Sequence, residues 1–274
     1  MEMRQGYAAV NGTQLYFQLA GSEHPMVFLH GFAGGSRLFD DQFKAFAQHS
    51  QVIRYDLRGF GKSDLPTSEP YCHYDDLKAL LQYLGIARAD LVGQSMGGAI
   101  AIDFTLAYPD MTRALILLDS TLGGFEHSPE FQAWFAFLVS QASEAGVEMA
   151  KALLLDTPLL ESARANPDVA RRLGQVFSEY SGWHWINEDP GAELEPPAIQ
   201  RLEQIRAPTL IITGEHTGTD LRAIGDFLQA RIPNAHAIIL NGVGHVPNME
   251  DPQTVNEIVL DFLASFTRDE SQQR

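Results

Sequence analysis

The sequence predicts an α/β fold in which a mostly parallel central sheet is flanked by helices and carries an inserted helical cap. Short strand-like runs alternate with helical patterns through the first half of the chain. The alternation stops between 121 and 195, where Leu, Ala, Glu and Arg dominate, and it resumes after Pro196-Pro197. The predicted core therefore comprises residues 1–120 and 196–274, and the predicted cap comprises 121–195.

The elements of the first half follow from hydrophobic spacing. Runs of apolar, β-branched and aromatic residues predict strands at 14–19, 26–30, 52–55, 89–94 and 113–119. Apolar residues that recur every three or four positions predict helices at 38–50, 73–85 and 96–108. Strands that are separated by helices run parallel and need cover on both faces, which is the basis for the predicted sheet.

The second half contains the proposed insertion and then the closing elements. Strands are expected at 207–214 and 235–240, and helices at 221–232 and 254–266. The segment between them and the first half lacks a convincing strand and holds all three tryptophans. Glycine-containing turns flank it at Gly123-Gly124 and 189–191, where a movable cap would hinge. The alternative is that these helices belong to the core layers and the turns are rigid.

Composition excludes several classes of function. The 274 residues carry 19 Lys and Arg against 35 Asp and Glu, a net charge of −16, so neither nucleic acid nor an anionic membrane is an expected partner. The single Cys72 cannot form an intrachain disulfide, and no apolar run is long enough to span a membrane. The first ten residues lack the apolar stretch of a secretory signal. We expect a soluble cytoplasmic protein of undetermined oligomeric state.

The strongest chemical signal is a G-x-S-x-G motif, Gly93-Gln94-Ser95-Met96-Gly97, placed between a predicted strand and a predicted helix. That context suits a serine held on a sharp, strained turn with its hydroxyl exposed, since larger residues at the glycine positions would clash. Ser95 is therefore the predicted nucleophile. The alternative is an ordinary serine in a glycine-rich turn.

A serine hydroxyl needs a base to act as a nucleophile at neutral pH. Of nine histidines, His245 in Asn241-Gly242-Val243-Gly244-His245 follows the last predicted strand, and strand ends are where α/β sheets place their sites. His184, between two tryptophans, is expected to pack rather than react. No histidine pair has metal-ligand spacing, so we expect neither a metal nor a cofactor.

The oxyanion of an acyl-transfer intermediate needs two backbone donors. One is expected at Met96, directly after the nucleophile, and the other at Phe32 in the loop His30-Gly31-Phe32-Ala33-Gly34-Gly35 after an early strand. The alternative is a glycine turn that binds nothing.

In these motifs the chain resembles the α/β-hydrolase fold family, and specifically its serine esterases and enol-lactonase-like hydrolases. His30-Gly31-Phe32 is similar to the family's oxyanion loop, 56–63 to its structural loop after the next strand, 93–97 to its nucleophile elbow and Gly244-His245 to its histidine loop. The resemblance covers nearly the whole chain outside the cap. Because a serine, not an aspartate, occupies the elbow, it disfavours dehalogenase and epoxide hydrolase activity.

The chain departs from that family pattern at the triad acid. The usual aspartate position after the strand at 207–214 holds Thr217, which cannot stabilise an imidazolium as a carboxylate does. Asp119, at the end of an earlier strand, is the first substitute, as in some relatives. Asp220 is the second, although it also reads as a helix N-cap. The third reading is that no acid acts and the protein is nearly inactive.

The predicted activity is hydrolysis of a small apolar carboxylic ester or lactone through an acyl-enzyme. The cap is rich in aromatic residues, and we expect a substrate pocket lined by Trp134, Phe135, Trp183 and Trp185. No arginine cluster indicates an anionic substrate. The alternatives are a carbon–carbon bond hydrolase, a cofactor-free haloperoxidase-like enzyme, and a ligand-binding protein with an impaired triad.

Overall fold

A computed structural model describes residues 3–272 of the chain and shows one sheet of eight strands in the order β1-β2-β4-β3-β5-β6-β7-β8. β1 and β2 pair antiparallel, β2 also pairs antiparallel with β4, and every later pairing is parallel. The bounds of the strands are β1 Met3–Val10, β2 Thr13–Ala20, β3 Pro25–Leu29, β4 Gln51–Tyr55, β5 Ala89–Gln94, β6 Thr112–Leu118, β7 Thr209–Gly214 and β8 Ala235–Leu240. The predicted mostly parallel α/β sheet is confirmed.

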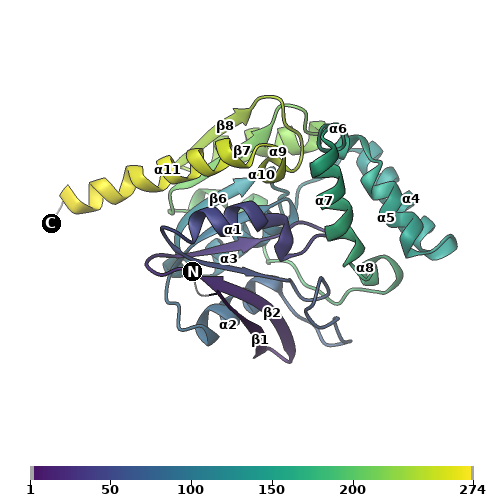
Figure 1. The fold of residues 1–274 in the computed structure, drawn as a ribbon, viewed down its shortest axis with the longest axis horizontal. Helices are drawn as coiled ribbons and strands as arrows, with labels where there is room; N and C mark the ends of the chain where they lie inside the picture. The colour runs from purple at the N-terminus through teal and green to yellow at the C-terminus, as the bar shows by residue number, and fades with distance from the viewer. Residues whose placement is uncertain (1–2, 273–274) are drawn as a thin grey trace.

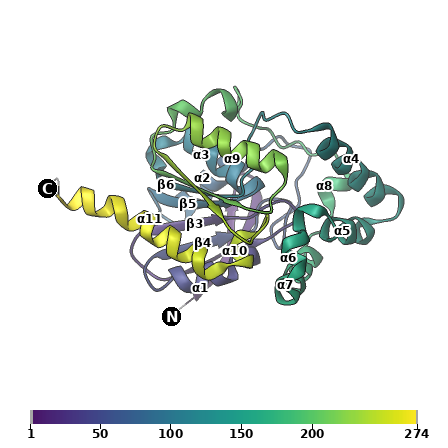
Figure 2. The same cartoon turned by 90° about the horizontal axis from the view of Figure 1, so that it is seen from above.

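Helices cover both faces of this sheet, and Figure 2 shows α2, α3 and α9 on one face with α1 and α11 on the other. The central strands β3, β5 and β6 are almost entirely buried, which explains their continuous apolar runs. The bounds of the core helices are α1 Asp40–Phe46, α2 His73–Tyr83, α3 Met96–Ala107, α9 Thr219–Arg231, α10 Pro247–Glu250 and α11 Pro252–Gln272. Within the described residues, no helix is both long and apolar enough to cross a membrane.

A group of five α-helices lies beside the sheet in Figures 1 and 2 and comes from the stretch between β6 and β7. Their bounds are α4 Pro129–Glu144, α5 Val147–Leu155, α6 Glu161–Ala165, α7 Pro167–Ser178 and α8 Trp183–Ile186. We call them the α4–α8 segment. Two of them, α4 and α7, begin with an N-terminal proline and a capping side chain, and Ser128 before α4 accepts a hydrogen bond from the Phe131 N–H at 3.3 Å.

The two connections between this segment and the sheet lie against each other. The Ile199 N–H donates to the Gly123 carbonyl oxygen at 3.1 Å. Gly124 has a positive φ of 82°, and a Cβ there would press on the side chains of Pro197 and Ile199. Glycine is therefore required where the chain enters the segment next to the place where it leaves.

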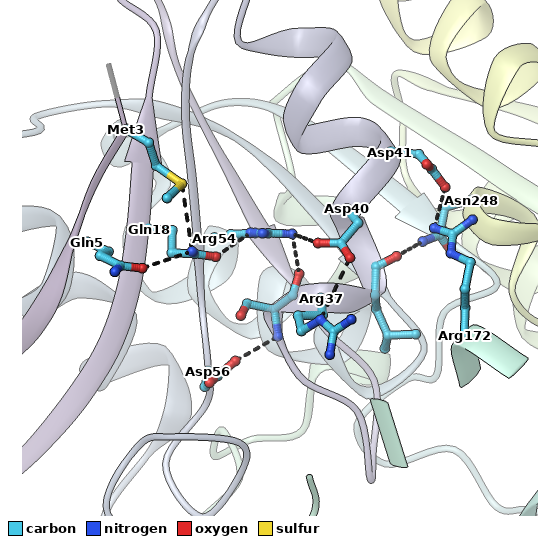
Figure 3. A network of polar contacts seen from close by, with 12 residues as sticks. Met3, Gln5, Gln18, Arg37, Asp40, Asp41, Arg54, Asp56, Arg172 and Asn248 are labelled. Atoms are coloured by element: carbon cyan, nitrogen blue, oxygen red, sulfur yellow. Dashed lines mark hydrogen bonds and ion pairs between the residues drawn. The ribbon is translucent and has the colours of Figure 1, made fainter. Parts of the chain in front are cut away.

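Figure 3 shows a polar network that ties the first strands to α1 and α7. On β4, Arg54 donates to Gln18 at 2.8 Å and to Asp40 at 2.5 Å. Farther along, Arg172 of α7 pairs with Asp41 of α1 at 2.5 Å. This second pair joins the α4–α8 segment to the core beside the loop that follows β3.

Candidate active site

Ser95 lies on a sharp turn between β5 and α3, with φ 52° and ψ −121°. A non-glycine residue in this region of backbone space is strained and persists only where its surroundings hold it. Those surroundings are tight, because a Cβ at Gly93 would meet the backbone of Gly97, and a Cβ at Gly97 would meet the Leu29 carbonyl oxygen. The motif is thus a turn in which close backbone packing fixes the serine.

Asp119 lies directly after β6 and reaches the histidine predicted as the base. Its Oδ2 is 2.7 Å from Nδ1 of His245, and its side chain has no exposed area. The Gly214 N–H donates to Oδ1 at 3.4 Å. Of the two carboxylates that the sequence left open, Asp119 is the one placed against the imidazole.

Thr217, which stands at the position where the family resemblance placed the acid, also contacts Asp119. Its Oγ1 donates to Asp119 Oδ2 at 2.5 Å, the same oxygen that faces His245. From the sequence, this threonine is only the absence of an acid. The contact was not foreseeable from local pattern, since the two residues are 98 positions apart.

Asp220 lies elsewhere, and the alternative that made it the acid is wrong on geometric grounds. Its Oδ2 accepts from both the N–H and the hydroxyl of Ser128 at 3.0 Å and lies 3.4 Å from Nδ1 of His127. The N-cap reading also needs correction, because α9 begins at Thr219 with Gly218 as its N-cap. Asp220 instead anchors the start of α4 to the core.

The loop after β3 brings the Phe32 backbone beside the elbow. A turn closed by the Gly34 N–H and the Gly31 carbonyl at 3.1 Å shapes this loop. Met96 is the first residue of α3, where backbone N–H groups have no partner within the helix. Both Phe32 and Met96 line the cavity that contains Ser95.

His30, fully buried behind this loop, holds the loop in place as a neutral imidazole. Its Nε2 accepts from the Leu57 N–H at 3.0 Å, so its Nδ1 carries the proton and donates to the Gly31 carbonyl at 2.8 Å. Burial lowers its pKa and favours this neutral form.

Two further side chains support the histidine loop and were missed from the sequence. Gln94 donates to the His245 carbonyl oxygen at 2.9 Å. Glu250 accepts from the N–H groups of Gly244 and Val246 at 2.9 and 3.1 Å. A Gln inside the elbow motif and a Glu five residues after the histidine are the only sequence signals of these contacts.

The loop at 56–63 is built as internal scaffolding. Asp56 accepts from the N–H groups of Ser36 at 2.7 Å and Lys62 at 2.9 Å, which fixes the end of the loop after β3. Arg58 forms a two-bond ion pair with Asp76, and both side chains are almost fully buried.

A cavity of about 750 Å³ lies between the loops at the carboxyl ends of the strands and the α4–α8 segment. Both Ser95 and His245 line it. This volume is in the range of small-molecule sites. Of the four residues expected in the substrate pocket, Trp134 and Phe135 line this cavity, and Trp183 and Trp185 do not. Among the described residues, no group of three His, Cys, Asp or Glu side chains is placed to hold a metal ion.

The prediction for the other two tryptophans is wrong because their rings pack against neighbouring aromatic side chains and not along the cavity wall. Trp185 is 2% exposed and packs edge-on against Tyr180 with ring centroids 4.9 Å apart. Trp183 packs against His184 at 5.1 Å. His184 itself stacks on Phe60 at 4.4 Å, as expected for a packing residue, and burial lowers its pKa to about 4.

These features define the class of protein, a hydrolase with a serine elbow, and the chain belongs to the alpha/beta hydrolase fold family, whose pattern it matches over residues 24–252. It is 29% identical over 267 residues to the 2-hydroxy-6-oxononadienedioate/2-hydroxy-6-oxononatrienedioate hydrolase of Paraburkholderia phymatum, covering 92% of each chain.

Two solved structures are similar over nearly their whole length. The first, described as Est816, an N-acyl homoserine lactone degrading enzyme, is 30% identical with a TM-score of 0.78, covering 94% of this chain and 100% of that one. The second is the enol-lactonase of Burkholderia xenovorans LB400, at 26% identity and a TM-score of 0.77, covering 95% and 100%. The predicted resemblance to esterase- and lactonase-like hydrolases is confirmed.

Proposed function

We propose that this protein hydrolyses a small, apolar carboxylic ester or lactone through a covalent acyl-enzyme on Ser95. The observation that carries the proposal is the 2.7 Å contact between Asp119 Oδ2 and His245 Nδ1, in a cavity that also contains the strained Ser95. The similarity to a lactone-degrading enzyme and an enol-lactonase supports the substrate class.

The proposed mechanism begins at the histidine. With Asp119 accepting from Nδ1–H, Nε2 of His245 is unprotonated, and its lone pair can take the proton of Ser95. The serine Oγ then attacks the acyl carbonyl carbon, and the N–H groups of Phe32 and Met96 stabilise the oxyanion. The imidazolium protonates the departing alkoxide, and the acyl group stays on Oγ.

Deacylation repeats these roles with water. His245 takes a proton from water, which attacks the acyl carbonyl, and the returned proton restores the Ser95 hydroxyl as the acid departs. We propose that residues 121–195 form a cap over this reaction. Its helices supply Trp134 and Phe135 to the cavity wall and would exclude bulk water from it.

Covalent trapping tests the nucleophile directly. A fluorophosphonate probe should add one label to the wild-type protein by intact mass, and the label should map to Ser95. Ser95→Ala should take no label and lose hydrolysis of p-nitrophenyl butyrate, whereas the exposed control Ser265→Ala should keep both. Substantial ester hydrolysis by Ser95→Ala would exclude the acyl-enzyme mechanism.

A further inference from the structure

The cavity extends from the nucleophile along one face of α3. Ser95, Ala99 and Asp103 are spaced four residues apart, so they share a face of the helix, and all three line the cavity. Eight residues of helix place Asp103 about 12 Å along the axis from Ser95. The proposed mechanism uses the near end of this face and leaves the far end unexplained.

Asp103 is a buried carboxyl group with an unpartnered oxygen. The residue is 8% exposed, and its Oδ1 is inaccessible yet has no hydrogen-bond partner in the structure. This oxygen lies beside Gly123, where even an added Cβ would stay 3.6 Å from it. Buried carboxyl oxygens nearly always have a partner, so an orphan oxygen on a side chain that lines the cavity points to a ligand group.

The electrostatics at this end favour a cation. Asp103, Asp189 and Glu193 line it, whereas no Lys or Arg is among the residues that line the cavity. Arg37, beside the loop after β3, is engaged by Glu179 at 2.7 Å. A ligand carboxylate would meet like charge here, and an ammonium group would meet opposite charge.

The environments of Asp103 and His73 add to this preference for a cation. Burial, and after it the charge of Glu193, raises the pKa of Asp103 to about 7, with the charge of Arg201 opposing the shift. A bound cation would offset the free-energy cost of holding the Asp103 carboxylate ionised in this buried position. His73 also lines the cavity, has a buried Nδ1 without a partner, and has its pKa lowered by burial to about 3. It is therefore neutral, and its unpaired nitrogen can accept from an ammonium N–H in the tautomer that protonates Nε2.

We propose that the far end of the cavity binds a protonated amine at the end of an otherwise apolar substrate, with Asp103 as its charge partner and His73 as a second acceptor. This rests on the proposed function, since the other end of that substrate is the ester or lactone carbonyl at Ser95. The wall between them is apolar and includes Ile100, Leu122 and Phe125. The substrate class is thus an amino-terminated acyl ester or lactone, and not a dicarboxylate.

A pair of esters that differ only in charge tests the proposal. The p-nitrophenyl esters of 8-(dimethylamino)octanoate and 9-methyldecanoate have the same shape, and their chains span roughly the two helical turns between Ser95 and Asp103. At pH 8, where Asp103 is ionised, wild type should show about tenfold or greater kcat/KM for the ammonium ester. Asp103→Asn should bring that ratio close to one, because it lowers kcat/KM for the ammonium ester much more than for the uncharged ester.

Control variants separate recognition from structure. Glu193→Gln, whose side chain is exposed, should lower the ratio less than Asp103→Asn, and the distant, exposed Asp261→Asn should leave it unchanged. The proposal is overturned if wild type shows no preference, if Asp103→Asn keeps the preference, or if that variant lowers both esters equally.

A binding measurement keeps this inference separate from the catalytic one. Octylammonium and octan-1-ol are titrated by calorimetry into Ser95→Ala, with and without Asp103→Asn. Octylammonium that binds more tightly than octan-1-ol, and loses this advantage in Asp103→Asn, supports the amine site. If neither ester is cleaved, only the esterase proposal is refuted. Hydrolysis of both esters, with octylammonium binding no more tightly than octan-1-ol, would refute only the amine site.

Discussion

Replacing Asp119 by asparagine tests the acid of the proposed triad with little disturbance of the fold. Asp119 has a positive φ of 45°, a conformation that asparagine tolerates far better than alanine. With its NH₂ group in the place of Oδ2, asparagine can donate to Thr217 Oγ1, which then acts as the acceptor. Its NH₂ group would face His245 Nδ1 and favour the tautomer with the proton on Nε2, which cannot accept the serine proton.

The expected loss follows from the geometry of this contact. The Asp119–His245 bond is 2.7 Å long and the carboxylate has no exposed area, so water cannot replace it. The corresponding change in a comparable triad lowers kcat by about 10⁴, which is roughly 5 kcal/mol of transition-state stabilisation. KM for a p-nitrophenyl ester should change little, because the carboxylate does not line the cavity.

The assay is steady-state hydrolysis of p-nitrophenyl butyrate by wild type, Asp119→Asn and the matched control Asp220→Asn. Asp220 contacts Ser128 and not the imidazole, so its variant should stay within a few-fold of wild type. Circular dichroism checks that all three are folded. An Asp119→Asn variant within tenfold of wild type, or a collapse in Asp220→Asn alone, would refute the assignment.

A rescue variant tests whether a carboxylate at position 217 can replace the one at Asp119. Thr217 Oγ1 is 2.5 Å from Asp119 Oδ2, so a carboxylate introduced by Thr217→Asp lies one hydrogen bond from the imidazole. Added to Asp119→Asn, it should recover at least tenfold in kcat by restoring a negative partner for His245. No recovery, with both variants folded, would show that this strand end cannot supply the acid.

Three further predictions concern packing and charge. Gly97→Ala should lower kcat at least about a hundredfold and destabilise the fold by roughly 1–3 kcal/mol, because its Cβ would press on the Leu29 carbonyl and displace the oxyanion donors. Arg58→Met should cost about 3–5 kcal/mol in urea unfolding, because it leaves Asp76 buried and unpaired. Asp103 has a folded pKa of about 7 against an ordinary 3.8, so it binds more protons when folded; stability should fall as pH rises from about 4 to 7, and Asp103→Asn should lack that decline in thermal scans.

A matched control for each of these predictions separates the proposed cause from a general effect of mutation. Gly174→Ala on α7, where an added Cβ meets nothing within 4 Å, should keep kcat within a few-fold if the Gly97 effect is steric. Arg171→Met removes an exposed pair with Asp168 and should cost no more than about 1 kcal/mol. An equal loss in both arginine variants would contradict the burial argument. A pH profile of Asp103→Asn identical to wild type would show that this carboxyl ionises normally.

The core elements were predictable because local spacing and tertiary position agree in a parallel sheet. The helix over Met96–Ala107 and the strand over Ala235–Leu240 lie where apolar periodicity placed them. β1 was missed, since Met3–Val10 is an exposed edge strand and its side chains give only a weak apolar pattern. The closing helix runs beyond its predicted end at 266, because charged residues do not interrupt helical backbone.

The site was predictable only where one local motif defines a backbone shape. The elbow at Ser95 depends on neighbouring glycines, so sequence alone located it. The partner of His245 lies 126 residues away, and a side-chain contact across that distance leaves no local signal. The same limit explains the error at Trp183 and Trp185, because helical spacing does not say which ring faces a cavity and which faces a neighbouring helix.

The meeting of Gly123 and Ile199 bears on how such enzymes diversify. A segment whose two ends lie side by side can be lengthened, shortened or exchanged between homologues without pulling the sheet apart. Everything that the proposed chemistry requires follows β3, β5, β6 or β8, outside that exchangeable module. Exchange of the segment at this one junction would therefore keep the residues of the proposed chemistry. It would change the residues that line the cavity from the side of the α4–α8 segment, and with them the choice of substrate.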